Sequence, residues 1–298
     1  MPEDYYAKED VYGENGVLLL GKGQRITEKA KERLKKFKSF KPDTYLFEEN
    51  NEKPSDYASW SGPRNDSELC SEHEQKYIHG QIAETSRIIN ALKARMCIHD
   101  DCVLETPNKV LNTIIFDSKT EPWWIYVNAL SNYVSWVYTH SIDVAIISII
   151  LAKELGYDDK ELWNIGLGAF LHDVGKLLIP KEILENHRVL DACETDSIQQ
   201  HCELGMISLK PFCLAKECTD IVMQHHERLD GSGYPRGLKS DEICRNARIV
   251  MVADAFDAIT SWRPYRKPKN ADDAIRMLRD EGARYPQDLV SLLEQILK

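Results

Sequence analysis

From Glu72 to the C-terminus, apolar residues recur every three to four positions, which is the period of a helix with one buried face. After residue 60, hardly any stretch shows the alternation of apolar and polar residues that predicts a half-buried strand. This pattern excludes a sheet-based fold for most of the chain. We therefore expect a mainly α protein whose C-terminal part is an all-helical domain.

Helix-capping residues divide this region into segments. Gly156 stops one predicted helix, Asn270 is suited to be the N-cap of another, and Asp191 with Glu194 has the spacing of a capping box. Pro286 suits the first turn of the last helix. The predicted helices cover residues 72–98, 107–116, 123–135, 140–155, 160–172, 194–204, 216–226, 245–261, 271–280 and 287–297.

The N-terminal part follows a different pattern. Residues 16–20 and 44–47 are predicted as strands, and residues 26–37 carry apolar and basic residues at helical spacing, with Thr27 as a possible N-cap. Together they predict a small α+β module. The predicted organisation is therefore this module over residues 1–50, a polar linker with two prolines over 51–71, connecting helices over 72–124 and the helical domain over 125–298.

The composition is that of a soluble globular protein, with 43% hydrophobic and 29% charged residues and a mean hydropathy of −0.44. The longest apolar run, residues 144–152, is far too short to span a bilayer, and the first ten residues lack the basic and apolar regions of a signal peptide. The eight cysteines form no CxxC pair, which argues against a zinc ribbon. We expect a cytoplasmic protein with reduced thiols and no membrane partner.

The net charge of −10 argues against a protein that coats a nucleic acid polymer, because such proteins are more often basic. An anionic substrate would need a local positive site. Metal ions and a few Arg or Lys side chains can provide one.

Histidine and aspartate occur in an ordered series of short segments. His140 lies in YTHS, His172 and Asp173 in FLHDVGK, His201 in IQQHCELG, His225 and His226 in QHHE, and Asp254 in VADAFDA. Iron, manganese and zinc prefer such ligands, and two such metals can split a phosphodiester. A carboxylate in an apolar helix, such as Asp254, is costly to bury unless it meets a cation.

Each segment has an ordinary explanation when it is taken alone. A single histidine on an apolar helix is usually a core residue, HD and HH dipeptides arise by chance, and Asp254 could cap a helix or pair with Arg248. The order and spacing of the segments, with the Asp230–Pro235 loop between them, favour a joint metal site.

The chain resembles the HD-GYP family of cyclic dinucleotide phosphodiesterases, a branch of the HD phosphohydrolase superfamily. The matching segments are YTHS, AFLHDVGKLLIP, QQHCELG, QHHERLDGSGYPRGL and RIVMVADAFDAITSWRPYR. The resemblance runs from about residue 125 to the C-terminus and implies an all-helical catalytic domain. The N-terminal segment GVLLLGKGQRITEKAKERLKKF also resembles a small module that precedes such domains.

The resemblance implies two metal sites that share one carboxylate. The first would use His140, His172, Asp173 and Asp254, and the second His201, His225 and His226, with Asp173 bridging both. Family members commonly carry iron and sometimes manganese. Those with a third metal have a Glu four residues before the first ligand histidine. Here that position is Trp136, so we expect two divalent transition metals.

The resemblance also implies substrate contacts. Lys176 would lie near the scissile phosphate, Tyr234 would shape the wall beside the substrate, and Arg263 and Arg266 would hold phosphates or guanine edges. The residue types alone leave other roles open. Lys176 could neutralise a helix C-terminus, the arginines could form surface ion pairs, and Tyr234 could be ordinary packing.

Two acidic residues beside the loop have two possible roles. Glu227 and Asp230 could orient ligand histidines through hydrogen bonds, or they could only cap and turn the chain.

The function implied by the resemblance is hydrolysis of cyclic di-GMP to linear pGpG, and further to GMP, by a hydroxide that bridges the two metals. Three alternatives stay open: hydrolysis of another cyclic dinucleotide such as a GMP–AMP hybrid, a receptor or adaptor that binds without turnover, and a nucleotidase acting on mononucleotides. The GYP loop and the RPYR segment count against the last. A homodimer through residues 72–98, or a signalling protein bound at the basic segment KAKERLKKFK, is also open.

Overall fold

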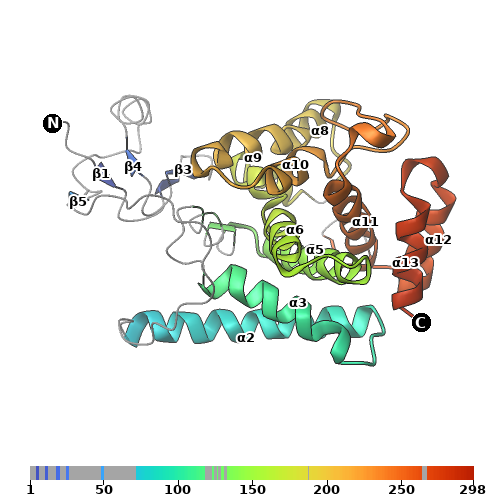
Figure 1. Ribbon diagram of the computed structural model, residues 1–298. Coiled ribbons are helices and arrows are strands. Elements are labelled where there is room, and N and C mark those ends of the chain that lie inside the picture. Colours follow the sequence, from blue (N-terminus) through green and yellow to red (C-terminus); the bar gives the residue numbers. More distant parts are fainter. Residues whose placement is uncertain are drawn as a thin grey trace.

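The computed structural model describes five short strands within residues 1–49, and then residues 72–117, 123, 126, 129, 130, 133–186, 188–263 and 267–298. In these ranges the protein is mainly helical, as the sequence predicted (Figure 1). The strands are Tyr5–Tyr6 (β1), Val11–Tyr12 (β2), Leu18–Leu20 (β3), Arg25–Ile26 (β4) and Glu48–Glu49 (β5).

The strands pair in two small antiparallel sheets. The order is β4-β1-β5 in one sheet, and β2 pairs with β3 in the other. The predicted strand at 16–20 corresponds to β3, whereas the predicted strand at 44–47 lies outside the described residues. So does the predicted helix at 26–37, apart from Ile26, which belongs to β4. The small α+β module therefore stays a prediction.

Helices make up the rest of the described chain. They are α2 (Glu72–Arg95), α3 (Cys102–Asn112), the π-helical turn η1 (Thr113–Asp117), α5 (Ser135–Glu154), α6 (Asp159–Leu171), the 3₁₀ helix η2 (Val174–Leu178), α7 (Lys181–Leu184), α8 (Ala192–Gln199), α9 (His201–Leu209), η3 (Lys210–Phe212), α10 (Lys216–Gln224), η4 (Ser240–Glu242), α11 (Arg245–Thr260), α12 (Ala271–Asp280), η5 (Gly282–Arg284) and α13 (Gln287–Ile296).

Local signals located most of these helices and some of their ends. Asn270 caps α12 by accepting from the Asp273 N–H at 2.8 Å, and Asp191 and Glu194 form the predicted capping box. The predicted helix at 107–116 begins too late, because Pro107 lies inside α3 and not in its first turn. The predicted helix at 194–204 is two helices, α8 and α9, which meet at Gln200.

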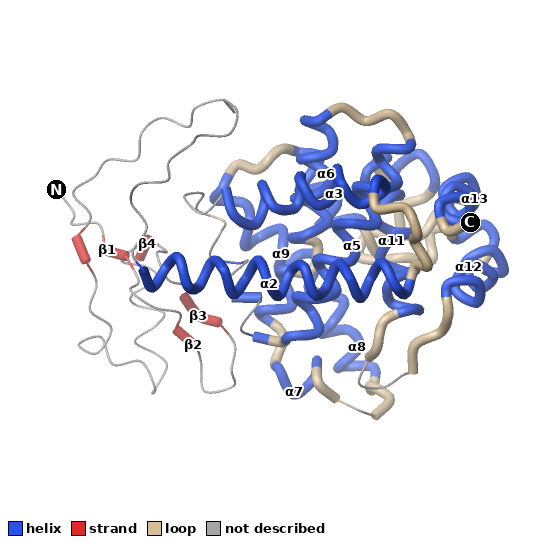
Figure 2. The backbone as a smooth tube through the Cα atoms, turned by 90° about the horizontal axis from the view of Figure 1, so that it is seen from below, coloured by secondary structure: helices blue, strands red, loops and turns tan. Residues whose placement is uncertain are grey.

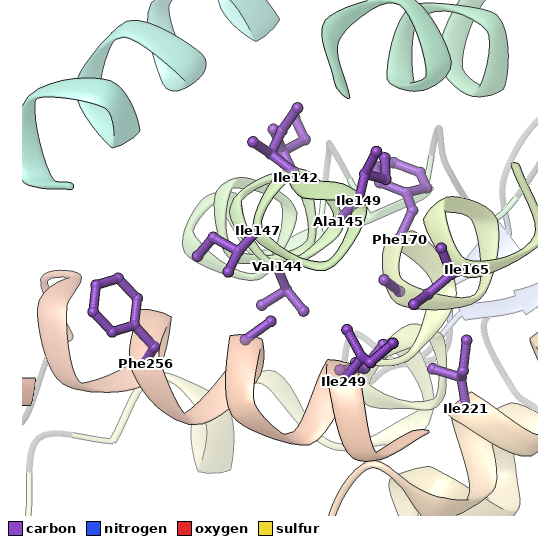
Figure 3. Close-up of a cluster of buried hydrophobic side chains, with 14 of the residues drawn as sticks. Ile142, Val144, Ala145, Ile147, Ile149, Ile165, Phe170, Ile221, Ile249 and Phe256 are labelled. Carbon is purple, nitrogen blue, oxygen red and sulfur yellow. The ribbon is translucent and has the colours of Figure 1, made fainter. Parts of the chain in front are cut away.

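The core is built around α5. It contacts α2, α3, α6 and α11, and α2 with α3 lies on the opposite side of it from α11 in Figure 1. Figure 3 shows the apolar side chains that meet there: Ile142, Val144, Ala145, Ile147 and Ile149 from α5, Ile165 and Phe170 from α6, Ile221 from α10, and Ile249 and Phe256 from α11. Burial of each of the Ile, Val and Phe side chains in this set stabilises the fold by about 1.5–3 kcal/mol.

By length and composition, the stretch Trp136–Glu154 could cross a membrane. In the fold, 83% of its most apolar window is buried by the surrounding helices. A helix that is apolar on all sides is expected at the centre of a helical domain. The apolar character of α5 is therefore explained by its place in the core.

The long helix α2 runs along the outside of the helical domain (Figure 2). It packs on α5 and buries Ile88, Ile89 and Leu92. Its last turn brings Arg95 against α5 and α11, which carry two of the predicted metal ligands.

Candidate metal centre

Seven side chains that the sequence singled out lie together in the interior. They form two groups, His140, His172 and Asp254 in one and Asp173, His201, His225 and His226 in the other. Within each group the possible ligand atoms lie within 4.8 Å of one another. The structure thus brings together residues that are more than a hundred positions apart in the chain.

Helix ends position most of these residues. His172 and Asp173 follow α6, His201 begins α9, and His225 and His226 follow α10. Asp254 lies in the middle of α11. The expectation that His140 begins a helix was wrong, because α5 already begins at Ser135 and His140 lies in its second turn.

Asp173 belongs to the second group, also faces the first, and is completely buried. Its Oδ2 is 3.2 Å from His172 Nε2 and 3.6 Å from His140 Nε2, and its Oδ1 is 3.3 Å from His201 Nε2. One carboxylate therefore faces both groups, with one oxygen directed to each.

A glycine makes this position possible. Gly175, in η2, lies so close to α9 that a Cβ there would be 1.9 Å from the His201 carbonyl oxygen and 2.6 Å from the Gly205 nitrogen. Only a residue without a side chain permits this approach. The approach places Asp173 beside His201.

The rings of three histidines are oriented by backbone carbonyls. Nδ1 of His172 lies 2.6 Å from the Ala169 oxygen, and Nδ1 of His201 lies 2.6 Å from the Ile198 oxygen. Nδ1 of His225 lies 3.1 Å from the carbonyl oxygens of both Ile221 and Val222. A carbonyl can only accept, so each Nδ1 carries the proton and each Nε2 of the neutral ring presents a lone pair.

These lone pairs point at one another. Nε2 of His201 and Nε2 of His225 are only 3.2 Å apart. His172 Nε2 and Asp173 Oδ1 are buried and have no hydrogen-bond partner within the described ranges. Facing acceptors without a donor are unfavourable in a dry interior unless a cation lies between them. The site therefore fits metal ions.

The protonation states suit metal ligation. Burial lowers the pKa of His201 to about 4 and holds the pKa values of His225 and His226 well below the usual range. Burial alone would raise the pKa of Asp173, but His172 and Lys176 hold it well below its usual value. At neutral pH these three histidines are neutral and this aspartate is charged, which is the state that metals bind.

His172 and Asp254 complete the electrostatic pattern. Burial disfavours the charged form of His172, but the adjacent Asp173 outweighs this and raises the pKa of His172. Burial likewise disfavours charge on Asp254, yet its contact with His140, 3.1 Å from Nε2 to Oδ1, holds the Asp254 pKa well below the usual range. The alternative partner considered for Asp254 was wrong, because Arg248 pairs with Asp241 at 3.2 Å.

Sequence reasoning missed a third buried aspartate. Asp257 lies three residues after Asp254 in α11, is completely buried, and has its Oδ2 2.6 Å from His140 Nδ1. The Asp257 carboxylate therefore accepts a hydrogen bond from the Nδ1–H of His140. This bond directs Nε2 of His140 toward Asp254 and Asp173. A signal for it was present, because a second carboxylate in the apolar segment VADAFDA is as costly to bury as Asp254.

Asp257 is in turn held by a residue outside the matching motifs. Arg95 Nη1 donates to Asp257 Oδ1 at 2.9 Å, and Arg95 Nη2 donates to the buried Asp143. Asp257 lies 162 residues and Asp143 48 residues from Arg95 in the chain, so no local sequence pattern predicts these contacts.

Two of the basic side chains expected to bind substrate, those of Lys176 and Arg263, lie against the ring of Trp136. Lys176 Nζ is 2.6 Å from Asp173 Oδ2 and 5.5 Å from the Trp136 ring centre. The Arg263 guanidinium is 4.5 Å from the same ring and 3.0 Å from His140 Nδ1. Because Arg263 is only 5% exposed, the alternative of a surface ion pair was wrong for it. Arg266 lies outside the described residues.

Tyr234 lies beside the second group. Its ring centre is 4.7 Å from that of His226 and 6.3 Å from that of His201, and its backbone N–H donates to the His226 oxygen at 3.2 Å. Burial raises the pKa of Tyr234, so its hydroxyl stays protonated.

Glu227 and Asp230 bond to the loop that carries Tyr234. The buried Glu227 carboxylate accepts from the N–H groups of Arg236 at 2.8 Å and Leu238 at 2.9 Å. Asp230 Oδ1 accepts from the Ser232 N–H at 2.9 Å. Neither forms a hydrogen bond to a histidine ring in the part of the chain that the structure describes. The geometry favours the turn-forming role over the orienting one.

Replacing Glu227 by alanine should lower the free energy of unfolding by about 2 kcal/mol, because two partly buried N–H groups lose their acceptor. Urea unfolding of the metal-free protein measures this. The matched control is Glu242→Ala, since Glu242 also accepts a backbone N–H, from Lys239 at 2.8 Å, but is exposed. Equal losses in the two variants would contradict the anchoring role of Glu227.

The chain matches the HD domain family over residues 125–289. Similar proteins include a cyclic di-GMP phosphodiesterase of Thermotoga maritima, 36% identical over 58% of this chain and 48% of that protein. The cyclic di-GMP phosphodiesterase PA4108 of Pseudomonas aeruginosa is 34% identical over 61% of this chain and 41% of its own length. The 3'3'-cGAMP-specific phosphodiesterase 3 of Vibrio cholerae is 32% identical over 67% of this chain and 43% of its own length. The chain thus spans less than half the length of these curated relatives.

Among solved structures, the fold is similar to that of Bd1817, an HDG"Y"P protein from Bdellovibrio bacteriovorus. The TM-score is 0.51 at 19% sequence identity, and the alignment covers 99% of this chain and 94% of that one. At this identity the likeness concerns the fold alone.

Proposed function

We propose, since this chain belongs to the HD domain family, that its buried histidines and aspartates hold two divalent metals and hydrolyse a cyclic dinucleotide. The observation that carries the proposal is the position of Asp173, whose two oxygens face two separate groups of ligand atoms. The similarity to phosphodiesterases that act on cyclic di-GMP and cGAMP supports this substrate class.

The proposed ligand sets follow the two groups. His140, His172 and Asp254 would hold one ion, and His201, His225 and His226 the other, with Asp173 shared. Nitrogen and carboxylate donors suit iron or manganese. Bound there, two such ions supply an activated water at neutral pH and neutralise charge on the phosphate.

We propose two metals and not three. Trp136 occupies the position from which a third ion would need a carboxylate, and its side chain offers no such atom. Two cations, Lys176 and Arg263, already lie against its ring. Their positive charge would repel a further ion.

The remaining polar residues of the site would act on the substrate. Lys176 places a positive charge beside Asp173, where negative charge develops on the phosphate oxygens during hydrolysis. Tyr234 would form the wall beside the second group, and Arg266 would bind phosphate or a guanine edge. The product would be the linear dinucleotide, which for cyclic di-GMP is pGpG, with GMP as a further product.

We also propose a cytoplasmic location, supported by the thiols. Seven cysteines fall in the described residues, and all seven are unpaired. A homodimer or a signalling partner stays a prediction.

The decisive experiment is incubation of anaerobically loaded iron or manganese protein with cyclic di-GMP, 3'3'-cGAMP and cyclic di-AMP, followed by chromatography of the products. We expect cleavage of at least one to a linear dinucleotide, two metals per chain, and no cleavage by the metal-free protein. A mononucleotide in a parallel incubation should stay intact. Tight binding without cleavage by the loaded protein would overturn hydrolysis and favour a receptor.

A further inference from the structure

Arg95 is the last residue of α2, and its side chain joins three helices. Nη1 donates to Asp257 Oδ1 at 2.9 Å and lies 3.4 Å from Thr260 Oγ1, both on α11, while Nη2 donates to Asp143 on α5. Three quarters of the side chain is buried. The planar fork of Arg holds two carboxylates in a fixed relative geometry, which the compact ammonium of a Lys does not.

Asp257 uses its two oxygens for two different purposes. Oδ1 accepts from Arg95, whereas Oδ2 accepts from His140 Nδ1 at 2.6 Å and from Ser261 Oγ at 3.1 Å. Arg95, Asp257 and His140 therefore form one hydrogen-bonded chain. It connects the end of α2 to a proposed metal ligand on α5.

Two guanidiniums face the two carboxylates of this chain, and burial together with Asp257 raises the pKa of Asp143 well above its usual range. Asp143 and Asp257 are at most 1% exposed, and a buried carboxylate is costly without a positive partner. Arg95 contacts both, and Arg263 Nη2 lies 3.8 Å from Asp257 Oδ2. Loss of Arg95 would remove the guanidinium that contacts Asp143 and would leave Asp257 with Arg263 alone. Oδ1 of Asp257 would then lose the donor that holds it, while Oδ2 would keep Ser261 and His140.

We propose that Arg95 is a positioning residue for the metal centre, and that α2 acts on the His140 group through Arg95 and Asp257. This rests on the metal-binding part of the proposed function. A shift of α2 relative to α11 separates Arg95 from Asp257, and the carboxylate that directs the His140 ring is then held through one oxygen alone. The second group, which contains His201 and His225, has no contact with Arg95 among the described residues and keeps its geometry.

The proposal gives α2 a specific role. The family match begins at residue 125, so α2 lies outside it, and the predicted linker joins α2 to the predicted N-terminal module. A ligand or partner that displaces α2 would change metal binding in one group and not in the other. The centre would then respond to events outside the matched domain.

The test is a Mn²⁺ titration of metal-free Arg95→Gln by calorimetry. Partners that orient a metal ligand typically contribute 10- to 100-fold to affinity, so one of the two sites should weaken by about that factor, while the other changes less than about threefold. Arg95→Lys keeps the charge but loses the planar fork, so the affinity of its weakened site should fall between those of the unaltered protein and Arg95→Gln. Electron paramagnetic resonance should show spin-coupled Mn²⁺ pairs in the unaltered protein and isolated Mn²⁺ in Arg95→Gln at the same loading.

The matched control is Arg87→Gln on the same helix, because among the described residues Arg87 pairs with Glu84 alone, and its side chain is 76% exposed. The Arg87→Gln protein should bind two Mn²⁺ ions with the same affinities as the unaltered protein. Unfolding of the metal-free variants in urea separates positioning from stability. Unchanged binding of two ions by Arg95→Gln, or equal weakening of both sites, would overturn the proposal.

These measurements need no substrate, so they stand apart from the hydrolysis experiment. Absence of any Mn²⁺ binding by the unaltered protein would sink the proposed function and this inference together. Binding of two ions without cleavage would leave the inference intact and reject only the hydrolysis.

Discussion

Replacing Asp173 by alanine should remove both metals at once and abolish turnover. Its Oδ2 faces His172 and His140, and its Oδ1 faces His201 at 3.3 Å, so each group loses a carboxylate oxygen when Asp173 is removed. Asp254 also contacts both groups, at 3.1 Å from His140 and 3.6 Å from His226, but it faces fewer of the histidines than Asp173 does. The loss in kcat/KM should be well above the roughly 100-fold that removal of an outer hydrogen-bond partner costs. Metal content by atomic absorption and initial rates with a cyclic dinucleotide measure the two effects.

Two further variants sharpen this experiment. Asp173→Asn keeps the size of the side chain and removes only its charge, and it should also lose both metals if the charge holds them together. Asp196→Ala changes an exposed aspartate on α8 and should have no effect. An Asp173→Ala protein that keeps one metal tightly would show that the two groups bind independently, which contradicts a shared ligand.

Gly175→Ala should destabilise the protein and empty the centre. The new Cβ would lie 1.9 Å from the His201 oxygen and 2.6 Å from the Gly205 nitrogen, and both are backbone atoms that no rotamer change can move. η2 must then move away from α9. Because Asp173 directly precedes η2, this movement takes Asp173 away from His201. We expect the free energy of unfolding to fall by about 3 kcal/mol or more, at the upper end of the cost of overpacking.

The control for this variant is another buried glycine. At Gly166 an added Cβ meets the ends of flexible side chains, Ile114 Cδ1 at 2.9 Å and Ile149 Cδ1 at 3.0 Å, which can move aside. Gly166→Ala should therefore cost about 1 kcal/mol and leave metal binding intact. Urea unfolding and metal content report both quantities. A Gly175→Ala protein as stable as Gly166→Ala would contradict the close approach of η2 and α9.

The parts of the structure that were predictable are those with a local signature. The helices after residue 72 follow from the spacing of apolar residues, and the caps at Asn270 and Asp191 follow from side chains that bond to the backbone three residues on. The seven candidate ligands were found because each lies in a short motif, and the structure brings them together. Their roles as ligands await the metal measurements.

The parts that were missed depend on partners far apart in the chain. Arg95 bonds to Asp143 and Asp257 across the helix packing, and Glu227 bonds to backbone groups nine and eleven residues later. The break between α8 and α9 at Gln200, and the four-residue α7 after Pro180, have no period long enough to detect. These features arise only once the helices are packed.

His172, His201 and His225 each take their ring direction from a carbonyl three or four residues earlier. Each imidazole is therefore fixed to its own backbone segment and moves with it as one rigid unit. The distance between two bound ions would then be set by how α6, α9 and α10 pack against one another. A core substitution far from the ligands would alter the ion–ion spacing before it loosened any single ligand.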